Sequence, residues 1–101
     1  MTNDTILEKD VDTIDNLKEP GKFKVIVYND DVTPVEFVVS LLITIFRHPQ
    51  SSALELTMKI HNEGSAIVGI YTHEIAEQKG MDATTISRNH GYPLIIKVEP
   101  E

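Results

Sequence analysis

A cluster of oxygen-bearing side chains in the sequence could bind a cationic group. Asn29, Asp30 and Asp31 are consecutive and follow an apolar run short enough to be a strand. Their oxygens accept hydrogen bonds, and an α-amino group offers several charged N–H donors. His61 adds another acceptor when its imidazole is neutral. Simpler interpretations stay open, because short polar side chains also hold turns and a histidine at a helix end interacts favourably with the helix dipole.

Patterns typical of catalysis or metal binding are missing from the sequence. The four histidines, at positions 48, 61, 73 and 90, have no close ligand spacing, and there is no cysteine. Asp30 and Asp31 are adjacent, so in an extended segment their side chains point in opposite directions rather than toward one bond. Neither a Gly-rich phosphate loop nor a GxSxG sequence occurs. We therefore expect no catalytic residue, no metal and no cofactor, and a binding protein rather than an enzyme.

Size and charge limit the remaining classes of protein. The 101 residues suffice for one domain with a single core. The formal net charge of −7 disfavours nucleic acid and anionic membranes as partners. The absence of cysteine excludes a disulfide scaffold and suits a reducing cytoplasm. The first residues lack the pattern of an export signal, and no apolar run approaches the roughly 20 residues of a transmembrane helix. We expect a cytoplasmic protein.

The elements that must position these side chains begin after an acidic segment. Residues 1–21 carry many carboxylates and end with Pro20 and Gly21, which predicts a flexible acidic arm followed by a folded domain over residues 22–101. Residues 23–28, FKVIVY, are aromatic and β-branched and predict a strand that stops at Asn29.

A first helix is predicted directly after the polar cluster. Thr33 suits the N-cap, Pro34 the first helical position, and Glu36 the far end of a capping box. Apolar residues recur at spacings of three and four over residues 37–46, which indicates a helix with one face in a core. Pro49 is expected to end this helix.

A second helix should present His61 on its last turn. Ser52 and Glu55 repeat the capping-box pattern ahead of it, and Gly64 can supply the left-handed residue that ends it.

The remaining residues predict a strand, a helix and a last strand. Residues 66–71 form the strand, Thr72 and Glu74 start the helix, and residues 92–98 form the last strand after Gly91. The expected fold is therefore α/β (α+β), in the order β-α-α-β-α-β. Three antiparallel strands would carry three helices packed on one face.

Four segments in this order and spacing resemble the ClpS family, the N-degron adaptors of Clp proteases. They are KVIVYNDDVTPVEFV, KIHNEG, AIVGIYTHEIAEQK and YPLIIKVE, and the resemblance covers about residues 22–101. It implies an adaptor that binds a free α-amino group together with a large apolar first residue and hands the substrate to a ClpA- or ClpC-type ATPase. It also implies a monomer.

The resemblance assigns roles to individual residues. The residues implied to hold the α-amino group are Asn29, Asp30 and His61. Those implied to border the pocket are Asp31, Thr33, Val35 and Thr57, and those implied to line its apolar floor are Val38, Ile60 and Leu94. A surface at the start of the third helix, with Glu74 and Lys79, is implied to contact the N-terminal domain of the ATPase, although most exposed charges only interact with solvent.

The chain departs from the commonest family pattern at two of these positions. Many relatives have Met where this chain has Val35, and a larger apolar residue is frequent where it has Thr57. Val is shorter and stiffer than Met, so we expect a wider pocket that also accepts Ile or Val as first residue.

Two other hypotheses differ in testable ways. A ClpS-like interaction domain would keep the core but not the pocket, so Asn29, Asp30 and His61 would not converge beside an apolar cavity. A small acid–base enzyme using the Asp pair and His61 would have to turn over a substrate.

Overall fold

The central strand of the sheet is β1 (Lys22–Tyr28), which pairs with both other strands. It runs antiparallel to β2 (Ser65–Thr72) on one side and to β3 (Ile95–Pro100) on the other, in the order β2-β1-β3. The structure is a computed structural model that describes residues 21–101. The predicted antiparallel sheet is confirmed, whereas residues 1–20 of the predicted arm lie outside the described residues.

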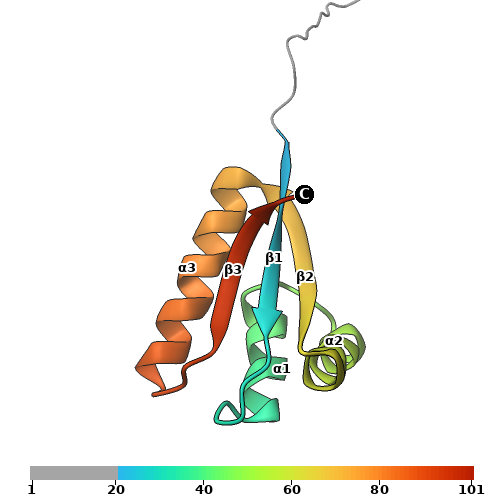
Figure 1. Ribbon diagram of the computed structural model, residues 1–101, viewed down its shortest axis with the longest axis vertical. Coiled ribbons are helices and arrows are strands. Elements are labelled where there is room, and N and C mark those ends of the chain that lie inside the picture. The colour runs from blue at the N-terminus through green and yellow to red at the C-terminus, as the bar shows by residue number, and fades with distance from the viewer. Residues whose placement is uncertain (1–20) are drawn as a thin grey trace, which may run out of the picture.

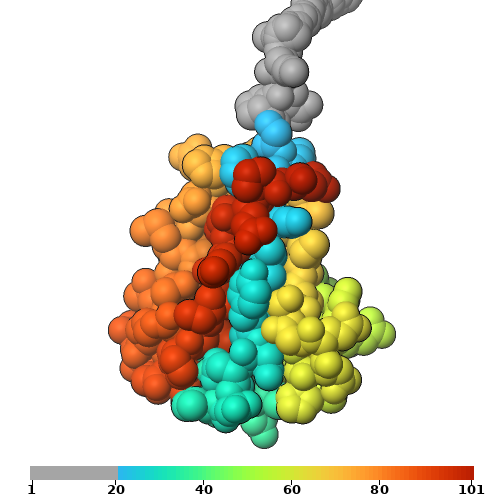
Figure 2. All heavy atoms as spheres, in the orientation of Figure 1, coloured from blue at the N-terminus to red at the C-terminus, as the bar shows by residue number. Residues whose placement is uncertain are grey.

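Three helices cover one face of this sheet. They are α1 (Val35–Thr44), α2 (Gln50–Glu63) and α3 (His73–Asn89), which gives the predicted order β-α-α-β-α-β (Figure 1). Val25 and Val27 of β1 are fully buried in one core cluster to which all three helices contribute. Because side chains alternate along a strand, Lys24, Ile26 and Tyr28 point to the other face, and Figure 2 shows the strands uncovered on that side.

Gly80 allows α3 to lie close against β3. It is buried in the middle of the helix, and a Cβ at this position would stand 3.1 Å from Cγ2 of Val98. A glycine in a helix interior costs about 1 kcal/mol relative to alanine, so its use here is explained by the close approach of strand and helix.

The predicted capping boxes are wrong for both α1 and α2. Each helix starts directly after a proline in extended conformation, Pro34 before α1 and Pro49 before α2, and neither N-cap makes a side-chain hydrogen bond. Thr33 instead donates to Asp30, while Ser52 and Glu55 lie inside α2. The proline ring fixes φ near the helical value without needing an N–H donor, and this makes it a suitable residue directly before a helix.

The ends of two other elements also differ from the sequence-based expectation. Helix α1 ends at Thr44, before Pro49, and Pro49 belongs to the start of α2. Strand β3 begins at Ile95 rather than at Tyr92. The segment before it is held by α3, because Arg88 Nη1 donates to the carbonyls of Tyr92 and Leu94. These carbonyls are therefore not free to pair with a neighbouring strand.

The ends of the second and third helices agree with expectation. Gly64 follows α2 with a φ of 94°, so His61 lies on the last turn of that helix. Thr72 precedes α3, and that helix ends at Asn89, shortly before Gly91. In the part of the chain that the structure describes, no helix has the length and apolarity needed to cross a bilayer.

Candidate functional site

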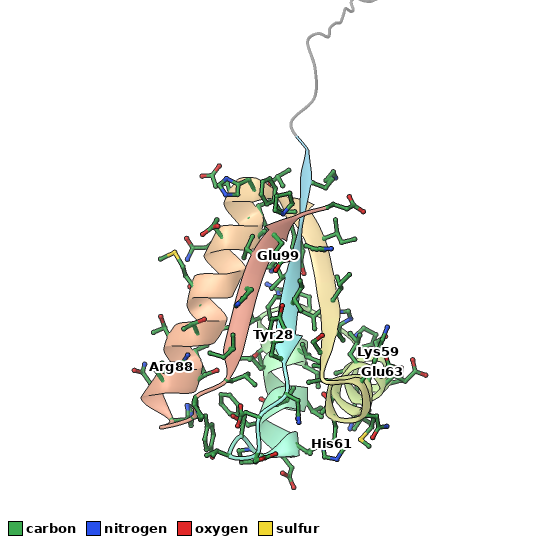
Figure 3. The ribbon with its side chains drawn as sticks, viewed as in Figure 1. Tyr28, Lys59, His61, Glu63, Arg88 and Glu99 are labelled. Atoms are coloured by element: carbon green, nitrogen blue, oxygen red, sulfur yellow. The ribbon has the colours of Figure 1, made fainter. Side chains whose placement is uncertain are left out.

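The loop after β1 and the end of α2 meet at one end of the sheet. Tyr28 is paired with Ser65, the first residue of β2, and the backbone N–H of Asn29 donates to the carbonyl of Gly64 at 2.9 Å. Since Gly64 caps α2, this contact joins the polar loop to the helix turn that carries His61. Figure 3 shows His61 at the end of the molecule where β1 passes into the loop.

Asp30 organises the loop with its carboxylate. Oδ1 accepts from the backbone N–H groups of Val32 and Thr33, and Oδ2 accepts from the Thr33 hydroxyl, each at 2.7 Å. A carboxylate has about four lone-pair sites, so roughly one, on Oδ2, stays available for a ligand. The turn-holding interpretation of this aspartate is therefore correct, and it leaves room for a binding role.

The pKa of the Asp30 carboxyl lies below its ordinary value. Desolvation by burial acts to raise it, but the hydrogen bonds from Thr33 and Val32 and the positive charge of Arg88 together outweigh that effect. Asp30 is therefore a stable anion at neutral pH, which is the form that accepts hydrogen bonds from a cation.

A cavity of about 320 Å³ opens beside this loop. Its lining residues come from the loop and from the facing turns of α1 and α2; they are Asn29, Asp30, Asp31, Val32, Thr33, Pro34, Val35, Val38, Thr57, Ile60 and His61. The polar end has Asn29, Asp30 and His61, whereas the buried side chains of Val38 and Ile60 supply apolar surface. Such a cavity is suited to a ligand with one cationic group and one apolar side chain.

The structure brings together all residues predicted for the pocket except Leu94. Leu94 is only 1% exposed and belongs to the core cluster that also contains Val38 and Ile60, but it is not among the residues lining the cavity. Val32 and Pro34 line the cavity without having been predicted. In the sequence they lie between loop residues that were predicted to line the pocket. Because a loop that wraps a cavity contributes most of its residues to the lining, both could have been predicted.

Asn29 and His61 differ from Asp30 in how their side chains are held. Among the described residues, neither side chain has a hydrogen-bond partner, and both residues are exposed. Their oxygen and nitrogen atoms therefore stay available to a ligand in the cavity. The site thus combines one fixed acceptor with two movable ones.

Thr57 is a buried wall residue whose hydroxyl is already satisfied. Its Oγ1 donates to the carbonyl of Ala53 at 2.7 Å, one turn earlier in α2. The cavity therefore does not have to provide it with a polar partner. Val35 also lines this cavity, but its side chain is exposed.

Glu74 and Lys79 lie on α3, away from this cavity. They line a separate surface depression with Ile75, Gln78 and Asp82. Lys79 Nζ donates to the carbonyl of Ile45 at 2.8 Å and lies 5.4 Å from the centre of the Tyr71 ring. Because α3 begins where β2 ends, the length of β2 puts roughly 25 Å between the helix start and the cavity, and Figure 1 shows α3 beginning at the opposite end of the sheet.

Comparison with known proteins agrees with this arrangement. Residues 18–97 match the family model described as ATP-dependent Clp protease adaptor protein ClpS. The Clp protease adapter ClpS of Helicobacter hepaticus is 39% identical over 95 residues, with 94% of each chain covered, and that of Treponema denticola is 46% identical, with 80% of each covered. The structure of Agrobacterium tumefaciens ClpS2 bound to L-phenylalaninamide superposes with a TM-score of 0.80 at 38% identity, over 82% of this chain and all of that one.

The chain belongs to the ClpS family. Its members are adaptor proteins, so this protein is an adaptor and not an enzyme. The fold and the cavity therefore belong to a protein whose task is recognition.

Proposed function

We propose that the cavity binds the first residue of an N-degron, with the α-amino group at its polar end and a large apolar side chain against its apolar wall. The observation that carries this proposal is the convergence of Asn29, Asp30 and His61 on one cavity next to Val38 and Ile60. L-phenylalaninamide, the ligand of the Agrobacterium adaptor, has the same two features: a free α-amino group and a large apolar side chain.

The polar end selects for free N-termini. An acetylated terminus has neither the charge nor the three N–H donors of an ammonium group, so the Asp30 carboxylate would lose its charged partner. Leaving a buried acceptor unsatisfied costs about 1–3 kcal/mol, and burying a large apolar side chain contributes about 1.5–3 kcal/mol. Both contributions are needed for tight binding. The ligand class is therefore a chain with a free α-amino group and with Leu, Phe, Tyr or Trp as its first residue.

The wall of this cavity supports a broader range of first residues. Val35 is a short side chain, and the hydroxyl of Thr57 is bonded within α2 and makes no demand on the ligand. Ile and Val as first residues are therefore accepted too. Ile-initiated peptides that bind more than about a hundredfold more weakly than Leu-initiated ones would contradict this expectation.

Delivery uses the far end of the molecule. The adaptor works as a monomer in the cytoplasm, with Glu74 and Lys79 on α3 in contact with the N-terminal domain of a ClpA- or ClpC-type ATPase, and with residues 1–21 acting during the handover. Because the α3 surface and the cavity lie at opposite ends of β2, both can be occupied at once. Deleting residues 1–21 should preserve peptide binding and impair degradation.

The test is calorimetric titration with Leu-initiated peptides that have a free or an acetylated N-terminus. The free peptide should bind and the acetylated one should not. His61→Ala should weaken binding of the free peptide, whereas the control His73→Ala, an exposed histidine on α3, should not. Equal affinities for both peptides, or no effect of His61→Ala, would exclude the proposed pocket.

A further inference from the structure

Helix α2 has two exposed apolar side chains next to the residues that line the cavity. Leu54 and Met58 are each 45% exposed, although large apolar side chains are usually buried. They lie on the same helix as Thr57 and His61, two residues of the cavity wall. A ligand that extends out of the cavity along α2 would therefore meet these two side chains.

Helix geometry makes Leu54 and Met58 a direct continuation of the cavity wall. At about 100° per residue, His61 lies about 40° around the helix axis from Thr57, Leu54 about 60° and Met58 about 100°, all in the same direction. Ile60, which lies on the other side of Thr57, is buried beneath the cavity. The wall thus continues past His61 to an exposed apolar strip, which we name the α2 shelf (Leu54 and Met58).

The distances suit the residues that follow the first residue of a bound chain. Along the axis of α2, Met58 lies about 4.5 Å and Leu54 about 10.5 Å from His61. An extended peptide advances about 3.3 Å per residue. A chain whose amino group is held beside His61 and which leaves along α2 therefore brings its second and third residues alongside the shelf.

We propose that the α2 shelf binds an apolar side chain at the second or third position of the substrate, and that this adaptor prefers N-termini with such a residue. This inference rests on the proposed function, because the first residue must occupy the cavity. The bound segment is identified by continuity, since the shelf and the cavity share one helix face. The opposite side of the mouth is also apolar, with Val32 62% and Val35 44% exposed, so a segment leaving the cavity passes between two apolar surfaces.

The experiment compares three peptides that differ only after the first residue. Peptides beginning Leu-Ser-Ser, Leu-Leu-Ser and Leu-Ser-Leu are titrated into the full-length chain. We expect one or both of the latter two to bind about three- to tenfold more tightly than Leu-Ser-Ser, as partial burial of one leucine implies. In the double variant Leu54→Gln, Met58→Gln this preference should disappear while the affinity for Leu-Ser-Ser stays unchanged.

A matched control is Met81→Gln on α3. Met81 is 60% exposed and does not line the cavity, so this variant should keep the preference. Gln is a good helix former, and both substitutions are on the surface, so the fold should be preserved. Equal binding of all three peptides, or a preference that survives in the double variant, overturns the shelf. Failure of Leu-Ser-Ser to bind at all would instead contradict the pocket itself, so the two failures are distinguishable.

Discussion

Replacing Asp30 by Asn separates the charge of this residue from its role in the loop. The Asn side chain keeps an oxygen that can accept from the backbone N–H groups of Val32 and Thr33, as Oδ1 does now. Its NH₂ group would replace Oδ2 and can donate to the Thr33 hydroxyl, which is able to accept as well as to donate. The loop should therefore keep its shape while the cavity loses its fixed negative charge.

The size of the expected effect follows from the one hydrogen-bonding site on Oδ2 that the loop leaves available. A hydrogen bond to a charged group contributes about 1.5–3 kcal/mol. Because Asp30 is only half-buried, the lower part of this range applies, and Asp30→Asn should weaken binding of a Leu-initiated peptide about ten- to thirtyfold. The free energy of unfolding should change by less than about 1 kcal/mol, since hydrogen bonds of the loop are retained.

Asp30→Ala should behave differently in the same two assays. It removes all three acceptor contacts of the loop and leaves the half-buried N–H of Thr33 without its partner. It should therefore lower the free energy of unfolding by about 1–3 kcal/mol as well as weaken binding. Calorimetric titration and urea unfolding measure the two effects, with Asp82→Asn on α3 as the control. Asp30→Asn with an affinity within twofold of the original protein would refute the reasoning.

Three further predictions test the charge, the packing and the delivery surface. Since the pKa of Asp30 is lowered in the folded protein, its carboxylate stabilises the fold above the unfolded pKa of about 4 and loses this contribution as the pH falls through the lower folded value; urea unfolding between pH 7 and pH 3 should show this loss below about pH 4, and Asp30→Asn should reduce it. Gly80→Ala should lower the free energy of unfolding by about 1 kcal/mol in urea, because the crowding against Val98 outweighs the gain in helix propensity; a more stable variant would contradict the tight packing. Glu74→Ala should leave peptide affinity unchanged and slow degradation in a reconstituted Clp system, and unchanged degradation would exclude this surface.

The fold could be predicted because its strands and helices differ clearly in pattern. β1 is a short run of aromatic and β-branched residues, and the helices show apolar spacings of three and four, so element type and order followed directly. The starts of α1 and α2 could not be predicted correctly, because each has a proline near a threonine or serine that also suits an N-cap, and the proline is the N-cap in both helices. The start of β3 depended on Arg88, whose side chain donates to the carbonyls of Tyr92 and Leu94, four and six residues further along the chain. No apolar pattern indicates such side-chain contacts.

The site was predictable for a different reason. Most of its residues lie within one loop and one helix turn, so they are close in sequence before they are close in space. What joins the two segments is a long-range contact, Asn29 with Gly64, which the residue patterns alone did not predict. Leu94 could not be placed in this way. A family motif assigns a role to a sequence position, but packing decides where the side chain lies, and the side chain of Leu94 lies in the core rather than on the cavity wall.

The three groups at the polar end should not contribute equally to binding. Asp30 is fixed by hydrogen bonds before any ligand arrives, whereas Asn29 and His61 have exposed side chains that must be ordered on binding. Ordering a side chain costs about 0.5–1.5 kcal/mol, which reduces the net gain from its contact. Asn29→Ala and His61→Ala should therefore each weaken binding less than Asp30→Asn does. The reverse order in calorimetric titration would show that the charge held by the loop is not the main determinant of selectivity for a free N-terminus.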